Sequence, residues 1–188
     1  MKHEQAYQIA VDVVRAIESH CDRCEIAGSL RRNCEEVGDI EIVCSPKVLV
    51  LKDLFGWDEG VVREPMFEKT INGLGKVVKG NADGKMMQIE LPEGIMIDLF
   101  IPDYSDYYRQ YAIRTGSAEF CKTVLAPSWV KKGWVGTKEG LRRRIDCLQI
   151  GKSWQVVNKY GAKPPVWESE EHCFQWLGIK YLSPEKRN

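Results

Sequence analysis

Three acidic residues in two strand-like segments constrain the fold of this chain more than any other feature. Asp39 and Glu41 alternate with isoleucines, and Asp98 lies in a second alternating run at 95–101. Because successive residues of a β-strand point to opposite faces, the acids and the aliphatic side chains separate onto two sides. We expect the two strands to be neighbours in one sheet, since only that arrangement brings the three carboxylates together.

Adjacent carboxylates repel each other, and divalent cations between them relieve this repulsion. Ligand sets made only of oxygen suit Mg²⁺ or Mn²⁺ better than Zn²⁺. The pattern therefore predicts two hard divalent ions held by Asp39, Glu41 and Asp98, at the spacing of about 3.5–4 Å that is typical of two-metal sites. Alternating acids also occur on ordinary half-exposed strands, so the interpretation depends on the residues around them.

A glycine-serine turn precedes the acids. Gly28 and Ser29 follow a short apolar run, and Arg31 and Arg32 come one residue after them. Glycine lets the backbone turn sharply and approach a ligand, which leaves amide and hydroxyl donors free for phosphate oxygens. An arginine fork matches phosphate geometry and stays charged. We expect one of the two arginines to hold a triphosphate near the metals.

Taken in order, these motifs resemble those of the family X DNA polymerases. Gly-Ser-x-Arg-Arg followed by Gly-Asp-x-acid is similar to the palm signature, and Ile97-Asp98-Leu99 resembles the strand with the third metal ligand. The run from Arg114 through Thr-Gly-Ser to Phe120 resembles the turn that opens the nucleotide-binding helix, and the segment 176–187 resembles the closing motif. The resemblance extends from about residue 6 to residue 187.

The resemblance implies an α+β fold in two parts. Residues 1–105 would form a nucleotidyltransferase palm, a mixed sheet flanked by helices, and residues 106–188 a small thumb-like α+β subdomain. The expected reaction is addition of dNMP from a dNTP to a DNA 3′-hydroxyl with release of pyrophosphate. The chain starts at the palm, so we expect a minimal enzyme without the DNA-gripping regions of larger relatives. A monomer acting on primed or gapped DNA is the corresponding expectation.

The resemblance also assigns roles to single residues. Asp39, Glu41 and Asp98 would bind two Mg²⁺ or Mn²⁺ ions, with Asp98 as general base or as ligand of the ion that activates the primer hydroxyl. The phosphates would be bound by Ser29, Arg32 and Gly38 beside Gly28, and the nucleotide sugar would lie next to Gly116 and Ser117. From its sequence alone, Ser117 is equally well explained as a helix cap.

Five positions depart from the family pattern. Glu41 replaces the second aspartate, and its extra methylene moves the carboxylate on a scale to which catalysis is sensitive, so we expect reduced activity or a preference for manganese. Val37 replaces a phosphate-binding serine. Ile113 and Arg114 replace an aromatic pair, which affects ribose discrimination, and Met96 replaces an arginine near the primer terminus. Two other functions therefore stay open: nucleotidyl transfer to RNA, protein or a small molecule, and a non-catalytic nucleotide- or DNA-binding module.

Composition limits the location and partners. The 188-residue chain has no apolar stretch of about 20 residues and no signal segment, so we expect a soluble, cytoplasmic protein without membrane contact. Its seven cysteines predict reduced thiols, and the single C-x-x-C at 21–24 is a weak zinc motif. Net charge is zero, but segment 122–152 has eight basic and two acidic residues, a typical footprint of a phosphate backbone partner. The alternative is a solvated surface.

The periodicity predicts most local elements. We expect a helix over 4–20, strands at 24–27 and 39–44, a helix over 47–55, and a hairpin that turns at Asn81-Ala82-Asp83-Gly84. We interpret the glycine-rich segment 73–76 as a turn. Ser117 is expected to cap a helix that runs towards residue 132, is kinked by Pro127 and ends before Gly133.

Overall fold

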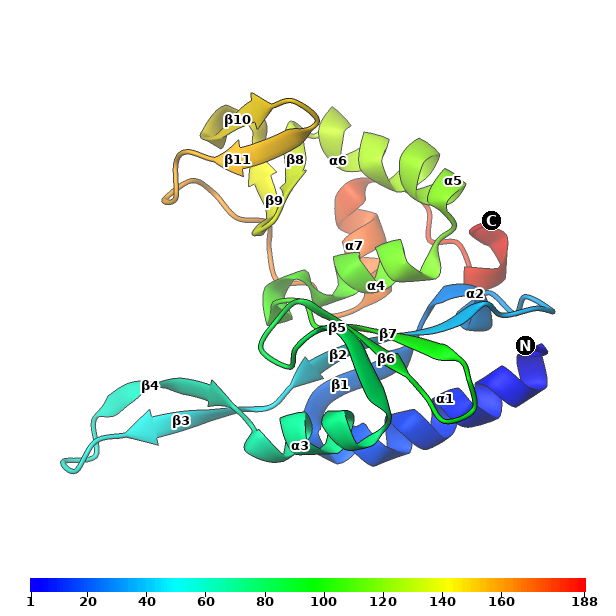
Figure 1. Ribbon diagram of the computed structural model, residues 1–188. Helices are drawn as coiled ribbons and strands as arrows, with labels where there is room; N and C mark the ends of the chain where they lie inside the picture. Colours follow the sequence, from blue (N-terminus) through cyan, green and yellow to red (C-terminus); the bar gives the residue numbers. More distant parts are fainter.

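A five-stranded mixed sheet lies at the centre of the computed structural model, which describes residues 1–188 (Figure 1). The strand order is β1-β2-β7-β6-β5. Their bounds are Cys21–Ile26 (β1), Asp39–Pro46 (β2), Lys76–Gly80 (β5), Met86–Glu90 (β6) and Met96–Phe100 (β7). Strands β2 and β7 are parallel, and the other pairs are antiparallel. The α+β class with a mixed sheet is confirmed.

One face of the sheet is covered by two helices, α1 (His3–Ile17) and α3 (Pro65–Gly73) (Figure 1). The aliphatic side chains of β2 and β7 pack there with α1 residues such as Ala10 and Ile17 and with Phe67 of α3. The helix predicted over 4–20 is confirmed, because its apolar stripe faces this core. A 3₁₀ turn, Glu18–His20, leads from α1 into β1.

The opposite face of the sheet packs against α2 (Gly28–Arg31) and α4 (Tyr107–Thr115). Val43 and Phe100 contact Tyr107 and Tyr111 in a small apolar cluster. The Tyr107 hydroxyl donates to the Val43 carbonyl at 3.1 Å. This cluster covers only one end of the face, and the acidic residues lie further along the same strands.

The remaining C-terminal elements lie above the sheet in Figure 1, and those other than β10 and β11 contribute to a second apolar core. They are α5 (Ala118–Phe120), a π-helical stretch (Cys121–Leu125), α6 (Ala126–Lys131), the hairpin of β8 (Trp134–Thr137) and β9 (Gly140–Arg143), the hairpin of β10 (Cys147–Ile150) and β11 (Ser153–Val156), and α7 (Glu170–Leu177). Short 3₁₀ turns are Tyr104–Asp106, Arg144–Asp146 and Pro184–Lys186. The division of the chain at 105/106 stays a prediction.

Two local predictions are confirmed. The Ser117 hydroxyl accepts from the Phe120 amide at 3.1 Å and caps a helical segment that ends before Gly133, whose φ is +80°. The segment is distorted before Pro127, which has no amide hydrogen to donate to the preceding turn. The hairpin of β5 and β6 turns at Asn81, whose side chain accepts from the Gly84 amide at 2.8 Å.

The helix predicted over 47–55 is wrong. This segment contains strand β3 (Val48–Lys52), which pairs antiparallel with β4 (Asp58–Arg63) in a ribbon that projects from the body (Figure 1). Four consecutive valines and leucines provide no polar face for a surface helix, and half of them are β-branched residues that favour strands. Gly56, with a φ of +84°, allows the chain to reverse at the tip.

Candidate functional site

The three predicted acidic residues lie on one face of the sheet. In the parallel pairing of β2 with β7, Glu41 is directly opposite Asp98 and Asp39 is opposite Met96. The alternate residues Ile40, Ile42, Ile97 and Leu99 are buried on the other face. The adjacency expected from the sequence is confirmed, and it places Glu41 and Asp98 on neighbouring strands with Asp39 two residues earlier.

The electrostatics of this face favour a cation. Burial, reinforced by the charge of Asp39, raises the pKa of Glu41 to about 7, although the nearby Arg114 guanidinium opposes this rise. Burial and the charge of Asp98 also raise the pKa of Asp39. A carboxylate with a raised pKa is one whose negative charge lacks compensation. All the donors are carboxylate oxygens, which suit a hard divalent ion.

The side-chain positions do not form a closed ligand cage. No group of three or more His, Cys, Asp or Glu side chains is gathered closely enough to hold a metal ion. The carboxylates thus share a face and a strand register, and their fit to Mg²⁺ or Mn²⁺ rests on donor chemistry and charge.

Gly28 lies directly beneath the Glu41 carboxylate. A Cβ atom at this position would be 2.3 Å from Glu41 Oε2, and the Gly28 φ is +65°. Both facts require glycine here. Gly38, in contrast, is exposed. A Cβ atom added at this position would have no other atom within 4 Å, so the surroundings of Gly38 do not require glycine.

The two arginines after the turn have different partners. Arg31 forms a two-pronged contact with Glu170 at 3.0 and 2.9 Å and stacks over the Tyr111 ring at 3.8 Å. Arg32 donates through Nη1 to the Thr115 carbonyl at 2.7 Å, and its charge, like that of Arg114, opposes the rise in the pKa of Glu41. Arg31 is therefore committed to a structural ion pair, and Arg32 is the arginine that acts on the acidic face.

The turn at Gly116 and Ser117 is brought beside α2 by this Arg32–Thr115 hydrogen bond. A Cβ at Gly116 would meet the Phe120 ring at 2.5 Å. The Ser117 hydroxyl caps α5, and the Ser117 amide donates to the Arg187 carbonyl at 2.8 Å. Ser29, the other predicted site residue in this area, lies on α2 and is partly buried. The structure thus brings the turn and Arg32 together.

Two residues of the acidic face were not predicted as site residues. Gln88 of β6 donates through Nε2 to Asp98 Oδ1 at 2.8 Å and orients that carboxylate. Arg114 of α4 lies over the Phe100 ring, with its Cζ 3.8 Å from the centroid, and its buried Nε has no partner. The hairpin register could have indicated Gln88, because β6 is the neighbour of β7. Nothing local to α4 indicates that Arg114 reaches the acids.

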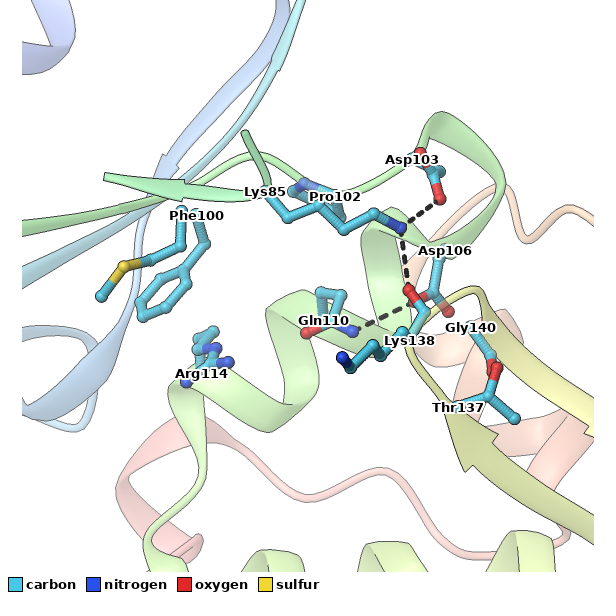
Figure 2. A pocket seen from close by; sticks show the side chains of 11 residues that line it. Lys85, Phe100, Pro102, Asp103, Asp106, Gln110, Arg114, Thr137, Lys138 and Gly140 are labelled. Atoms are coloured by element: carbon cyan, nitrogen blue, oxygen red, sulfur yellow. Dashed lines mark hydrogen bonds and ion pairs between the residues drawn. The ribbon is translucent and has the colours of Figure 1, made fainter. Parts of the chain in front are cut away.

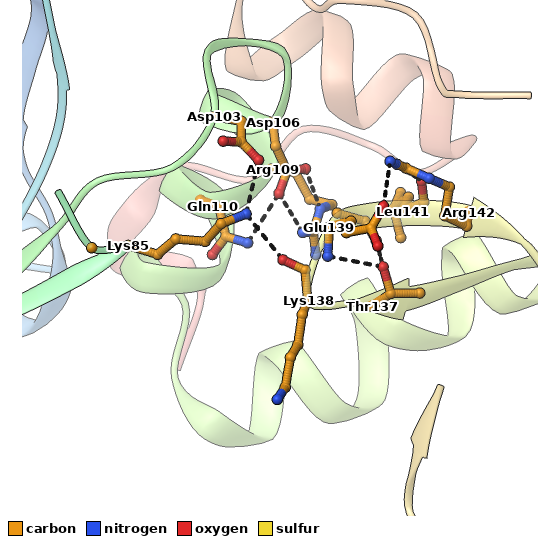
Figure 3. Close-up of polar contacts among 12 residues, drawn as sticks. Lys85, Asp103, Asp106, Arg109, Gln110, Thr137, Lys138, Glu139, Leu141 and Arg142 are labelled. Atoms are coloured by element: carbon orange, nitrogen blue, oxygen red, sulfur yellow. Dashed lines mark hydrogen bonds and ion pairs between the residues drawn. The ribbon is translucent and has the colours of Figure 1, made fainter. Parts of the chain in front are cut away.

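A cavity of about 230 Å³ lies beside this face. Phe100 and Arg114 line one side of it, and Lys85, Asp106 and Lys138 line the other (Figure 2). Lys85 is held by Asp103 at 2.8 Å and by the Lys138 carbonyl at 3.0 Å, so this polar network ties the β8–β9 hairpin to the sheet (Figure 3). None of the three carboxylates lines the cavity, which adjoins the acidic face through Arg114 and Phe100.

The basic segment 122–152 is only partly available to a partner. Arg142 is buried and pairs with Glu139 at 3.4 Å, while Arg143 and Arg144 are exposed and lie over the rings of Trp134 and Trp154. The five lysines of the segment are exposed: Lys122, Lys131, Lys132, Lys138 and Lys152. All seven cysteines are free thiols, and no helix combines the length and apolar character of a membrane span.

We compared the sequence with protein-family models and with the curated proteins. No protein-family model matches the sequence, and a search of the curated proteins finds no match.

Proposed function

We propose that this chain is a nucleotidyltransferase that transfers dNMP from a dNTP to a DNA 3′-hydroxyl, with release of pyrophosphate, in the manner of a family X DNA polymerase. The observation that carries the proposal is the parallel pairing of β2 with β7, which places Glu41 opposite Asp98 on the face that also bears Asp39. In this assignment residues 1–105 are the palm and residues 106–188 are the thumb-like part.

The charge of this face supports the proposal. The raised pKa values of Asp39 and Glu41 indicate carboxylates that gain by binding cations, and the acidic triad would hold two Mg²⁺ or Mn²⁺ ions. Ions bound there would neutralise triphosphate charge and make the acceptor hydroxyl more acidic. Asp98, oriented by Gln88 at 2.8 Å, is the group assigned to accept the proton of that hydroxyl.

Arg32 is the residue assigned to the triphosphate. Its Nη1 is fixed at the Thr115 carbonyl, which holds the guanidinium beside the acidic face before any substrate arrives. Such preorganisation reduces the entropy lost when a phosphate is bound. Gly28, whose bare Cα lies against Glu41, leaves room for a ligand and for the carboxylate together. Ser29, Gly38, Gly116 and Ser117 keep the assignments that the resemblance implies.

The proposal is tested by primer extension on gapped, primed and single-stranded DNA, with Mg²⁺ or Mn²⁺ and with dNTPs or NTPs. Asp98→Asn keeps the shape of the side chain and removes its charge, and we expect it to lower the rate by about 100- to 1,000-fold. The matched control is Asp83→Asn, in the exposed turn between β5 and β6, which should extend primers like the original protein. Mn²⁺ binding measured by calorimetry, together with the circular dichroism of both variants, separates loss of metal from loss of folding.

Template-matched incorporation that is lost in Asp98→Asn and kept in Asp83→Asn would support the polymerase function. Labelling of RNA, protein or a small molecule, again dependent on Asp98, would assign the same site to another acceptor. Nucleotide and metal binding without transfer to any acceptor would contradict catalysis and identify a binding module. Equal activity of the two variants would rule out the acidic face as the active site.

A further inference from the structure

Three of the seven free thiols gather on the face of the sheet opposite the acidic residues. They belong to Cys21 and Cys24 of β1 and to Cys44 of β2. Cys21 and Cys44 are part of the apolar core beneath α1 and α3, and Cys24 packs against it. Cys44 is fully buried, Cys21 is 7% exposed and Cys24 is half-buried. The cluster is therefore within reach of small reagents rather than large ones.

The strand register explains why the three thiols meet. In the antiparallel pairing of β1 with β2, Cys24 is directly opposite Cys44, and Cys21 is opposite Pro46, two residues further along β2. Residues three apart in a regular strand point to opposite faces. The register of β1 shifts between Cys21 and Arg23, however, and a bulge of this kind inserts an extra residue. Cys21 and Cys24 consequently point to the same side as Cys44.

The contacts among the thiols set their protonation. Hydrogen bonds from the thiols of Cys24 and Cys44 lower the pKa of Cys21 to about 4, although burial opposes this change. The same contacts with Cys21, together with burial, raise the pKa of Cys24 and that of Cys44. At neutral pH the cluster thus holds one thiolate between two thiols. The thiolate is the nucleophilic form of cysteine.

We propose that this cluster is a modification site that reacts with a small hydroperoxide and ends as a disulfide between Cys24 and Cys44. The Cys21 sulfur attacks one oxygen of hydrogen peroxide, the O–O bond breaks, and the other oxygen leaves as hydroxide and takes up a proton to form water. Cys21 is then a sulfenic acid. The Cys24 sulfur attacks the sulfenic sulfur, and the sulfenic hydroxyl leaves with the Cys24 proton as a second water.

The first disulfide, between Cys21 and Cys24, is then exchanged. The Cys44 sulfur attacks the sulfur of Cys24 and loses its proton to solvent, and Cys21 leaves as a thiolate. Exchange runs in this direction because the thiol of lowest pKa is the best leaving group. Directly opposed residues of antiparallel strands have Cα atoms about 4.5–5.5 Å apart, within the range of a disulfide, so the final bond fits the strand pair.

The final disulfide would close a loop over residues 24–44. This segment bears the glycine-serine turn, Arg32, Asp39 and Glu41. A cross-link across such a loop restricts the unfolded chain and stabilises the folded one. Oxidation would thus fix the segment that carries most of the acidic face, and a reducing thiol would release it. The thiol chemistry itself does not depend on the proposed function, because the cluster lies on the other side of the sheet.

Peptide mapping after treatment with hydrogen peroxide, in the presence of a chelator, tests the proposal. Trypsin cuts after Arg23, Arg31 and Arg32, so the three cysteines of the cluster fall in the separate peptides 16–23, 24–31 and 33–47. After the remaining thiols are blocked with iodoacetamide, we expect peptide 24–31 joined to peptide 33–47 and the loss of two of the seven free thiols. Fragmentation of the joined peptides distinguishes Cys44 from Cys34.

Three serine variants test the order of the steps. Cys21→Ser should slow formation of the disulfide at least ten-fold, because it removes the thiolate that meets the peroxide. Cys24→Ser should abolish the disulfide. Cys147→Ser is the matched control, since it removes a half-buried thiol outside the cluster, and it should react like the original protein. Circular dichroism checks that each variant is folded.

Thermal unfolding of the original protein supplies a test that needs no variant. The oxidised form should unfold at a temperature about 5–10 °C higher than the reduced form, and dithiothreitol should remove the difference. Equal unfolding temperatures of the two forms would overturn the proposal. So would an unchanged rate in Cys21→Ser, a lasting bond between Cys21 and Cys24, or oxidation to sulfinic acid without a disulfide.

Discussion

Replacing Glu41 by glutamine should stabilise the metal-free protein at pH 8 and have little effect at pH 4. The ordinary pKa of a glutamate is 4.5, and burial with the charge of Asp39 raises that of Glu41 to about 7. The folded protein thus binds this proton more tightly than the unfolded chain does. The stabilisation that results is complete below pH 4.5 and is lost as the pH rises through about 7. At about 1.4 kcal/mol per pKa unit, the loss is about 3 kcal/mol.

Urea denaturation in the presence of a chelator, at pH 4, 6 and 8, measures this effect. Glutamine has the shape of glutamate and does not ionise, so the free energy of unfolding of Glu41→Gln should exceed that of the original protein by about 3 kcal/mol at pH 8. Titrating groups remote from Glu41 are common to both proteins and cancel in the comparison. Glu93→Gln, at an exposed position outside the site, is the control and should show no pH-dependent difference.

Divalent ions should reverse the ranking at pH 8. Mg²⁺ or Mn²⁺ bound to the folded state stabilises the original protein by an amount that grows with the ion concentration, and Glu41→Gln should gain less. A difference between the two proteins that stays constant from pH 4 to pH 8 in chelator would refute the reasoning about burial. Equal stabilisation of both by metal would refute Glu41 as a ligand.

Three further substitutions test the packing around the site. Gly28→Ala should destabilise the fold by at least about 1–3 kcal/mol, because it combines a positive φ with a Cβ that meets the Glu41 carboxylate. Gly38→Ala is the control and should be tolerated, and thermal unfolding of the two variants measures the difference. Glu170→Ala leaves the buried Arg187 and the partly buried Arg31 without their carboxylate and should cost about 3–5 kcal/mol in urea denaturation. Ser117→Ala removes the cap of α5 and should cost about 1 kcal/mol, with calorimetry as the measurement.

Sequence periodicity was sufficient to predict secondary structure and the faces of strands where the signal was local and strong. The alternation around Asp39 and Glu41 and around Asp98 identified two strands and sorted acids from aliphatic residues, and the neighbouring position of the strands followed because nothing else would gather the acids. The cap at Ser117 was equally readable, since a cap depends on residues within one turn. The segment 47–55 failed because a short apolar run fits both a helix and a strand, and only the pairing with β4 decides between them.

By itself, then, the sequence determined which side chains share a face of β2 and β7, and it indicated the chemistry that such a face can support. The tertiary structure alone decided which distant residues join that face. It brought Arg114 from α4 and Gln88 from β6 to the acids, committed Arg31 to Glu170, and placed the Glu41 carboxylate on Gly28. The physical reason is that periodicity and capping act within a few residues, whereas burial, ion pairing and a raised pKa arise only when segments far apart in the chain exclude water together.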